Sequence, residues 1–460
     1  MHYLRINRIV LLGALALVLV LGGCSKTRET RLDNGLKVVV QEDHRSPVVV
    51  SQIWYTIGGM DEPKGITGVS HVLEHMMFKG TKKYPSGEFS RIIAENGGRE
   101  NAFTSRDYTA YFQTLEKSRL AIAFELEADR MTNLLLEDKE FRKELKVVME
   151  ERRLRTEDKP EGKLYEKFSA AAYTKHPYGN PIIGWMEDLK SLTIEDVRKW
   201  YGRWYAPNNA TLVVAGDVDP DEVFALAKKY FGSIPAREVT PMSIPVEPKQ
   251  KTRREIIVKV PAKVPSIIIG FHTPVHGFTD EVWEPYALDV LAGILDGGKS
   301  ARFSRDLVRA QRIAASASAG YDAIARAPSM FLVSGTPAPG KNIAQLKKAL
   351  LQQIKRIKEE IITEEELDRV KAQVSASDVY QRDSVFYQAM EIGILEASGL
   401  NRDLIDDYVD RINAVTVKQI KKVARKYLLE SNMTIAELKP LPFDQKRRPR
   451  PAVSGGRHGG

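Results

Sequence analysis

Short apolar runs and longer amphipathic segments alternate along the first half of this chain. Residues 36–41 and 48–55 are rich in β-branched and aromatic side chains, which predicts two strands. Two later runs, 99–114 and 210–215, predict further strands. Four longer segments have the composition of helices, at residues 86–95, 117–136, 138–157 and 193–205. A chain that alternates strands with helices in this way predicts an α/β fold.

The second half of the chain repeats features of the first half in the same order. Residues 46–50 align with residues 264–268, and residues 193–212 align with residues 416–435 at nearly the same spacing. Chance similarity between two α/β segments is the alternative explanation. Two matching blocks in one order indicate an internal duplication, so we expect two homologous domains.

A proline-rich stretch separates the two copies, with four prolines between positions 235 and 248. Such stretches form extended linkers. We therefore expect a first domain at residues 34–235, a linker at 236–255 and a second domain at 256–440. The polar residues 24–33 are predicted to be a tether, and the basic residues 441–460 are predicted to be a disordered tail.

The net charge of +9 over 460 residues is unevenly distributed. Two arginines lie in the first eight residues, and five basic residues lie between positions 446 and 457. The remaining chain is nearly neutral, which argues against a nucleic-acid-binding surface.

Residues 1–23 consist of a short basic start and an apolar run, a pattern typical of a secretory signal. The run ends in Leu-Gly-Gly-Cys, which resembles a bacterial lipoprotein signal. This resemblance implies cleavage before Cys24, lipid attached to its thiol and a periplasmic location. Because Ser25 rather than Asp follows Cys24, the resemblance favours a lipid anchor at the outer membrane. A plain signal peptide or an uncleaved anchor is the alternative. Cys24 is the single cysteine, so no intramolecular disulfide can form.

Residues 71–75 read His-Val-Leu-Glu-His in a helix-favouring segment. On a helix, His71 and His75 lie about 40° apart around the axis and share a face. Two imidazoles placed in this way can bind Zn²⁺ at about 2.0–2.1 Å. Glu74 borders the same face, where its carboxylate can accept a proton from water. Histidines with a purely structural role are the alternative to this interpretation.

A zinc site needs a third protein ligand, and the predicted helix at 138–157 offers several carboxylates. They are Glu140, Glu144, Glu150 and Glu151. Acidic residues on such a helix most often form a solvated face, and their spacing alone does not select one of them as a ligand.

Several motifs together resemble the insulinase/pitrilysin family of zinc peptidases, in particular its shorter bacterial and mitochondrial-processing-type members. They are the His-x-x-Glu-His run at 71–75, the pair Glu144 and Glu151, the segment from Gly97 to Thr104, and the Pro-Asn-Asn-Ala-Thr-Leu-Val-Val run at 207–214. The resemblance covers nearly all of residues 30–440. It implies two similar α/β domains that enclose a chamber, and peptides or flexible termini as substrates.

The resemblance also implies a role for individual residues. His71, His75 and Glu151 would bind one zinc ion per chain, Glu74 would be the general base, and Glu144 would orient a ligand. The strand formed by Asn101, Ala102, Phe103 and Thr104 would pair with an extended substrate.

One expected feature of the family is missing from the second domain. Active single-chain members carry an Arg and, seven residues later, a Tyr, where this chain has Val308 and Ala315. Arg309, Arg312 or Tyr321 are candidate substitutes. Some members of the family work as two chains, so we hypothesise that a homologous subunit supplies the pair, in a heterodimer or a homodimer.

The sequence therefore predicts a zinc-dependent endopeptidase of the bacterial cell envelope, as the zinc-bearing subunit of a two-chain enzyme. A non-catalytic lipoprotein that binds or scaffolds peptides is the alternative. The intact His71, Glu74, His75 and Glu151 argue against it.

Overall fold

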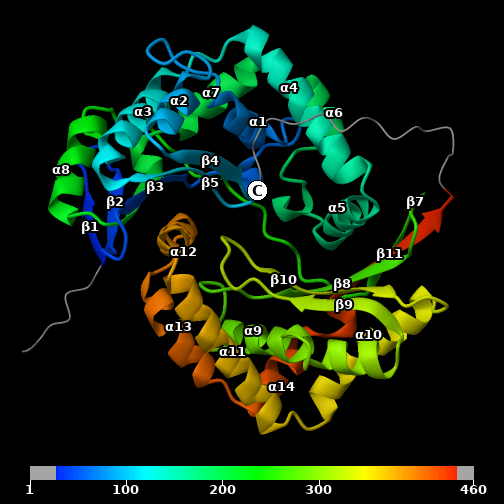
Figure 1. Ribbon diagram of the computed structural model, residues 1–460. Coiled ribbons are helices and arrows are strands. Elements are labelled where there is room, and N and C mark those ends of the chain that lie inside the picture. The colour runs from blue at the N-terminus through cyan, green and yellow to red at the C-terminus, as the bar shows by residue number, and fades with distance from the viewer. Residues whose placement is uncertain (1–26, 443–460) are drawn as a thin grey trace, which may run out of the picture.

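The computed structural model describes residues 27–442, which form two α/β domains that face each other (Figure 1). The predicted signal, the predicted lipidation site Cys24 and almost all of the predicted tail lie outside the described residues. Within residues 27–442, no helix is both long enough and apolar enough to cross a membrane.

The first domain contains a six-stranded sheet. Its strands are β1 (Thr27–Arg31), β2 (Lys37–Glu42), β3 (Val48–Tyr55), β4 (Arg99–Thr104), β5 (Thr109–Glu116) and β6 (Ala210–Gly216). They are ordered β1-β2-β6-β3-β5-β4, so β1 and β4 are the edges. The inner strands β2, β3 and β6 are largely buried, as their apolar runs predict.

The second domain contains a five-stranded sheet. Its strands are β7 (Arg254–Pro261), β8 (Ser266–Thr273), β9 (Ala314–Gly320), β10 (Ser329–Pro337) and β11 (Met433–Leu441). Their order is β7-β11-β8-β10-β9. In each sheet one pair is parallel, β2 with β6 and β7 with β11, and the other pairs are antiparallel.

Helices surround both sheets. Those of the first domain are α1 (Val69–Met76), α2 (Glu88–Glu95), α3 (Leu120–Asn133), α4 (Asp138–Arg152), α5 (Pro160–Ala172), α6 (Met186–Ser191), α7 (Ile194–Trp204) and α8 (Pro220–Phe231). Those of the second domain are α9 (Glu284–Asp296), α10 (Ile343–Glu359), α11 (Glu364–Arg382), α12 (Val385–Ala397), α13 (Asp403–Asn413) and α14 (Val417–Tyr427).

The equivalent order of the strands confirms that the two domains share one architecture. The aligned sequence blocks fall on matching elements, because β3 corresponds to β8 and β6 to β11. Helices α7 and α14 even begin with the same capping box, in which Thr193 pairs with Asp196 and Thr416 with Gln419. At the spacing that relates residues 46–50 to 264–268, residues 71–75 correspond to residues 289–293. These lie on α9, which contains no histidine.

One helix of each domain packs against the sheet of the other domain (Figure 1). Helix α12 packs its buried alanines and Ile392 against the first sheet around Trp54. Helix α5 packs Phe168 and its neighbours against β7, β8, β10 and β11 of the second sheet. Apolar interfaces of this kind favour one fixed arrangement of two domains.

Three segments differ from the sequence-based expectation. Residues 99–114 form two strands, because a turn at 105–108 reverses the chain between β4 and β5. Residues 27–31, expected within a tether, instead pair with β2 as an edge strand, whose polar side chains remain largely outside the core. The helix expected at 138–157 ends at Arg152 and continues as a π-helical turn.

Candidate metal centre and active site

Helix α1 carries the His-x-x-Glu-His motif, and all of its residues are buried. A carboxylate holds its N-terminus, because Glu62 accepts hydrogen bonds from the backbone N–H groups of Gly68 (2.6 Å) and Ser70 (2.8 Å). Gly68 has a φ of 87°, which favours glycine, and a Cβ there would lie 2.6 Å from the carbonyl oxygen of Ile183. The start of the helix is therefore fixed by its surroundings.

The structure brings His71, His75 and Glu151 together, and their ligand atoms lie within 4.8 Å of one another. The Glu151 Oε2 atom is 3.4 Å from His75 Nε2 and 3.8 Å from His71 Nε2. A tetrahedral zinc ion with bonds of about 2.0–2.2 Å keeps its ligand atoms roughly 3.3–3.6 Å apart. The 3.4 Å separation lies in this range and the 3.8 Å separation lies just outside it, so these two imidazoles and one carboxylate could hold a zinc ion.

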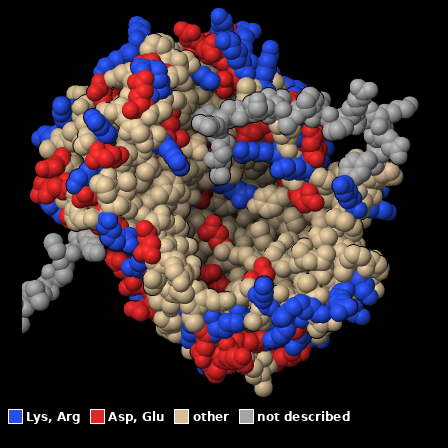
Figure 2. Space-filling model, viewed as in Figure 1, with Lys and Arg blue, Asp and Glu red and all other residues tan. Residues whose placement is uncertain are grey.

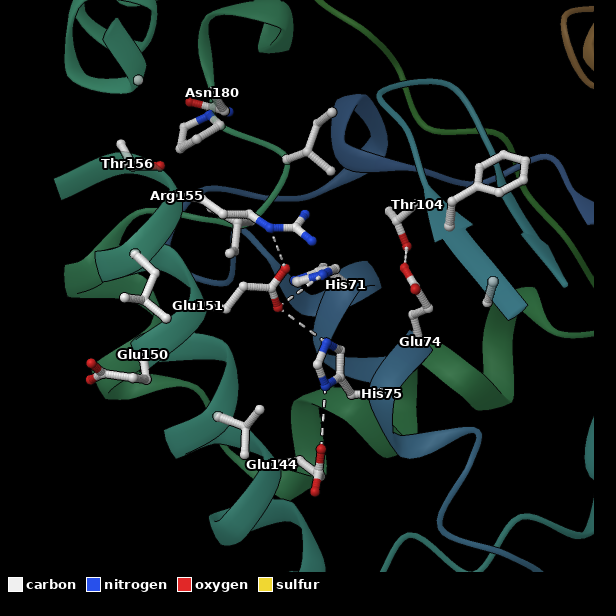
Figure 3. A pocket seen from close by; sticks show the side chains of 18 of the residues that line it. His71, Glu74, His75, Thr104, Glu144, Glu150, Glu151, Arg155, Thr156 and Asn180 are labelled. Atoms are coloured by element: carbon white, nitrogen blue, oxygen red, sulfur yellow. Dashed lines mark hydrogen bonds and ion pairs between the residues drawn. The ribbon is translucent and has the colours of Figure 1, made fainter. Parts of the chain in front are cut away.

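Helix α4 places Glu144 and Glu151 on the same face, because seven residues make nearly two turns. Glu144 Oε2 lies 3.3 Å from His75 Nδ1, the ring nitrogen that points away from Glu151 (Figure 3). Lys79 holds the other Glu144 oxygen at 2.8 Å. Glu144 therefore contacts the His75 ring on the side opposite to Glu151, and Glu151 faces both histidines.

The remaining two candidate carboxylates are not part of this group. Glu140 forms an ion pair with Lys143, and Glu150 accepts a hydrogen bond from Arg153 and points away from the histidines (Figure 3). The three-dimensional structure thus separates the four carboxylates that the spacing left equivalent.

The electrostatics of the group favour a cation between the histidines and the carboxylates. Burial would raise the pKa of Glu151, but the hydrogen bond with His75 and the charges of His71 and Arg155 lower it to about 2. Burial would lower the pKa of His75, but Glu144 and Glu151 raise it to about 9. A site that holds carboxylates ionised in this way is suited to a divalent metal ion.

Glu74 points away from Glu151, toward strand β4 (Figure 3). The Thr104 hydroxyl donates a hydrogen bond of 2.6 Å to Glu74 Oε2. Burial raises the pKa of Glu74, against the opposing effect of this hydrogen bond. A raised pKa makes a carboxylate a stronger proton acceptor, and the general-base role of Glu74 stays a prediction.

A cavity of about 940 Å³ opens over these residues. One wall is the outer edge of β4, and all four residues predicted to bind substrate, 101–104, line it. Exposed large hydrophobic side chains also line the cavity, namely Val147, Leu154 and Tyr165. Figure 2 shows the hollow between the two domains, with acidic and basic side chains around it.

The second-domain residues considered as substitutes for the Arg/Tyr pair do not line this cavity. Every described residue that lines it lies between His71 and Ile183. The Tyr321 hydroxyl donates a hydrogen bond of 2.5 Å to the Pro274 carbonyl, and Arg309 donates to the Lys299 carbonyl at 2.8 Å. Both side chains are therefore engaged within their own domain.

Comparison with known families gives matches over both domains. Residues 37–185 match the insulinase family (peptidase family M16), and residues 191–374 match the inactive domain of peptidase family M16. The zinc protease PqqE of Helicobacter pylori is 33% identical over 94% of this chain and 98% of its own. This chain belongs to peptidase family M16, the insulinase family of zinc proteases.

Other similar proteins agree with this assignment. An uncharacterized zinc protease of Bacillus subtilis, YmxG, is 27% identical over 86% of this chain and 94% of its own. A crystal structure of a protease from Helicobacter pylori superposes with a TM-score of 0.85 and 32% identity, over 90% of this chain and 100% of its own. The periplasmic protease PqqL of Escherichia coli has the same fold, with a TM-score of 0.77 at 20% identity over 90% of this chain and 48% of its own.

Two residues of this M16 site are not indicated by the sequence patterns. Glu62 caps helix α1 and is separated from it by a loop, so no helical spacing indicates it. Arg155 lies 2.9 Å from the second oxygen of Glu151. It follows Glu151 by four residues, a spacing at which an ion pair can be expected on a continuous helix.

Proposed function

We propose that this chain is a zinc-dependent endopeptidase that cleaves peptides or unfolded segments of proteins. The observation that carries the proposal is the grouping of His71, His75 and Glu151 beside Glu74 at the open edge of β4. His71, His75 and Glu151 would hold one zinc ion per chain. A non-catalytic peptide-binding role would not require this complete set of ligands with a base beside it.

In the proposed mechanism, the protein's own residues transfer the proton and orient the reacting groups. When bound, zinc supplies a Lewis acid that polarises the peptide carbonyl and activates water. Glu74 takes up a proton from the attacking water and returns it to the leaving amine. Thr104 fixes the orientation of the Glu74 carboxylate, and Glu144 fixes the orientation of the His75 ring.

The substrate would bind as an additional strand along β4. This strand is paired on one side only, with β5, and its free edge lines the cavity. Main-chain pairing requires an extended segment and accepts many sequences, with the neighbouring side chains adding specificity. A folded protein cannot present such a segment within the hollow between two domains, so peptides and flexible termini are the proposed substrates.

A second chain would complete the enzyme. This inference is supported by the cavity lining, to which the described residues of the second domain do not contribute, and by Val308 and Ala315 at the positions of the Arg/Tyr pair. A homologous subunit that carries the pair would supply positive charge and a hydroxyl to the developing oxyanion. A homodimer is the alternative form of this proposal.

We place the protein in the bacterial envelope, anchored by lipid on Cys24 at the outer membrane. The support for this location is the signal-like sequence at residues 1–23 and the Leu-Gly-Gly-Cys run. Metabolic labelling with a fatty-acid analogue would test it, with Cys24→Ser as the control. Labelling that survives Cys24→Ser would contradict the anchor.

The proposed activity is tested with a quenched fluorescent peptide, a chelator and added zinc. We expect hydrolysis that the chelator abolishes and zinc restores. Full efficiency of the chain alone, unchanged by Ala315→Tyr, would contradict the two-chain proposal while leaving the peptidase activity intact. Zinc binding without hydrolysis, relieved by a co-purified homologous subunit, would support it.

A further inference from the structure

A loop of the second domain reaches the first domain close to the active site. It connects β9 to β10 and includes residues 321–328. Ala325 and Ala327 are buried, and Ala327 packs with Met60 and Tyr178 of the first domain. A cavity of about 460 Å³ lies between this loop and the first domain, and it shares part of its lining with the active-site cavity.

Arg326 in this loop makes four hydrogen bonds to the first domain. Its Nη1 and Nη2 atoms donate hydrogen bonds of 2.8 and 3.2 Å to the Asp61 carboxylate. Nη1 also donates to the Asp107 carbonyl at 2.9 Å, and the Arg326 backbone N–H donates to the Asp107 carboxylate at 3.2 Å. The Asp61 side chain is only 3% exposed and that of Arg326 21%, so solvent screens this pair weakly.

The two aspartates that contact Arg326 lie in the segments next to helix α1 and next to strand β4. Asp61 precedes Glu62, whose carboxylate caps helix α1. Asp107 lies three residues beyond Thr104, in the turn that follows β4. The turns are also connected directly, because the Met60 N–H donates to the Arg106 carbonyl at 2.8 Å.

We propose that Arg326 is a positioning residue through which the second domain fixes the metal-bearing helix relative to the substrate strand. The Glu74–Thr104 hydrogen bond spans these two elements and therefore depends on their separation. Arg326 acts on the site without touching it, since it does not line the active-site cavity. A planar guanidinium suits this role because it can bind the carboxylate through two donors and still reach a carbonyl.

A second arginine provides a matched control. Arg402 also joins the second domain to the first, through Glu29 on β1, and has a similar exposure of 25%. Strand β1 lies at the edge of the sheet opposite to β4. Arg402→Gln therefore removes an ion pair between the domains that lies away from the elements that Arg326 contacts.

The test compares Arg326→Gln, Arg326→Lys and Arg402→Gln in the full chain. For Arg326→Gln we expect kcat/KM to fall about tenfold or more, because a buried aspartate loses its partner. Amide hydrogen exchange should become faster in residues 58–76 and 99–108. Arg326→Lys should recover only a part of both effects, because an ammonium keeps the charge but not the paired donors. Arg402→Gln should change neither by more than about twofold.

Equal effects of Arg326→Gln and Arg402→Gln, or unchanged exchange at 58–76 in Arg326→Gln, would overturn the proposal. If Arg326→Gln does not give folded protein, Asp61→Asn, which keeps the shape of its side chain, is expected to show the same local exchange. The activity readout rests on the proposed function, whereas the exchange readout does not. A wild-type chain that fails to hydrolyse peptides even with its homologous subunit would contradict only the proposed peptidase activity, and the exchange experiment would still decide the role of Arg326.

Discussion

The Thr104 hydroxyl lies 2.6 Å from the Glu74 carboxylate and donates a hydrogen bond to it. This contact joins the edge strand β4 to the metal-bearing helix α1, so the strand that would bind substrate also orients the predicted general base. A peptide paired with β4 would therefore be placed in a fixed relation to Glu74. In the proposed mechanism, one hydroxyl group would therefore couple substrate binding to proton transfer.

Removal of this hydroxyl should lower the turnover number. Thr104→Val keeps the shape of the side chain and its preference for a strand, so we expect kcat to fall about threefold to tenfold, as the loss of one hydrogen bond would produce. Thr104→Ser retains the donor and should remain close to wild type. Equal kcat values for Thr104→Val and wild type would show that Glu74 is oriented without Thr104.

Glu144 should affect metal affinity more than it affects the fold. It contacts the His75 ring nitrogen that faces away from Glu151, and loss of such a partner typically weakens metal binding about 10- to 100-fold. We expect this loss for Glu144→Ala in a competition titration with a zinc chelator. Glu140→Ala, on the same helix but outside the cavity, is the control. Similar zinc affinities for the two variants would argue against an orienting role.

Glu62 should make stability depend on pH. Burial raises its pKa from the ordinary 4.5 to about 8, despite hydrogen bonds from Gly68 and Ser70. The folded state therefore binds this proton more tightly than the unfolded state does. The resulting contribution to the free energy of unfolding is fully present below about pH 4.5 and is lost as the pH rises through about 8.

Urea unfolding between pH 5 and pH 9 tests this effect of Glu62. The free energy of unfolding of the wild type relative to Glu62→Gln should decrease as the pH rises over this range. A difference that stays constant or grows would mean that the Glu62 carboxylate is already ionised at pH 5. The variant also reports on the helix cap, because an amide has one acceptor oxygen where the carboxylate has two.

The close approach of the two domains depends on a glycine. A Cβ at Gly393 in α12 would lie 2.0 Å from the Trp54 ring of the first sheet. We expect Gly393→Ala to lower the free energy of unfolding by about 1–3 kcal/mol through overpacking.

Gly202→Ala is the matched control for Gly393→Ala, because Gly202 is also in a helix and a Cβ there would meet nothing within 4 Å. That variant should be neutral or more stable by up to about 1 kcal/mol. A Gly393→Ala variant as stable as Gly202→Ala would contradict the tight packing of α12 on the sheet.

The sequence was most informative where function depends on local spacing. His71 and His75 are one helical turn apart, so the motif alone predicts a shared face, and the structure has both on α1. Glu151 was selected through resemblance to a family, because its helix offers several carboxylates. Its distance from the histidines depends on how α1 and α4 pack, which no local pattern specifies.

Contacts between distant segments could not be predicted from patterns. Arg326 and Asp61 are far apart in sequence and lie in different domains. The exchange of α5 and α12 between the domains likewise depends on tertiary packing, since the apolar face of a helix does not identify the sheet that it covers. The strand β1 was overlooked because a polar edge strand has little of the alternation that identifies buried strands.

The proposed zinc peptidase is tested most directly by hydrolysis of a quenched fluorescent peptide by the zinc-loaded chain, compared with Glu74→Gln. We expect both proteins to bind one zinc ion per chain and the variant to lose activity by about 10²-fold or more. If the chain needs a partner, the same contrast should appear after the homologous subunit is added. If Glu74→Gln cleaves the peptide at the wild-type rate, Glu74 is not the general base and the proposed mechanism is wrong.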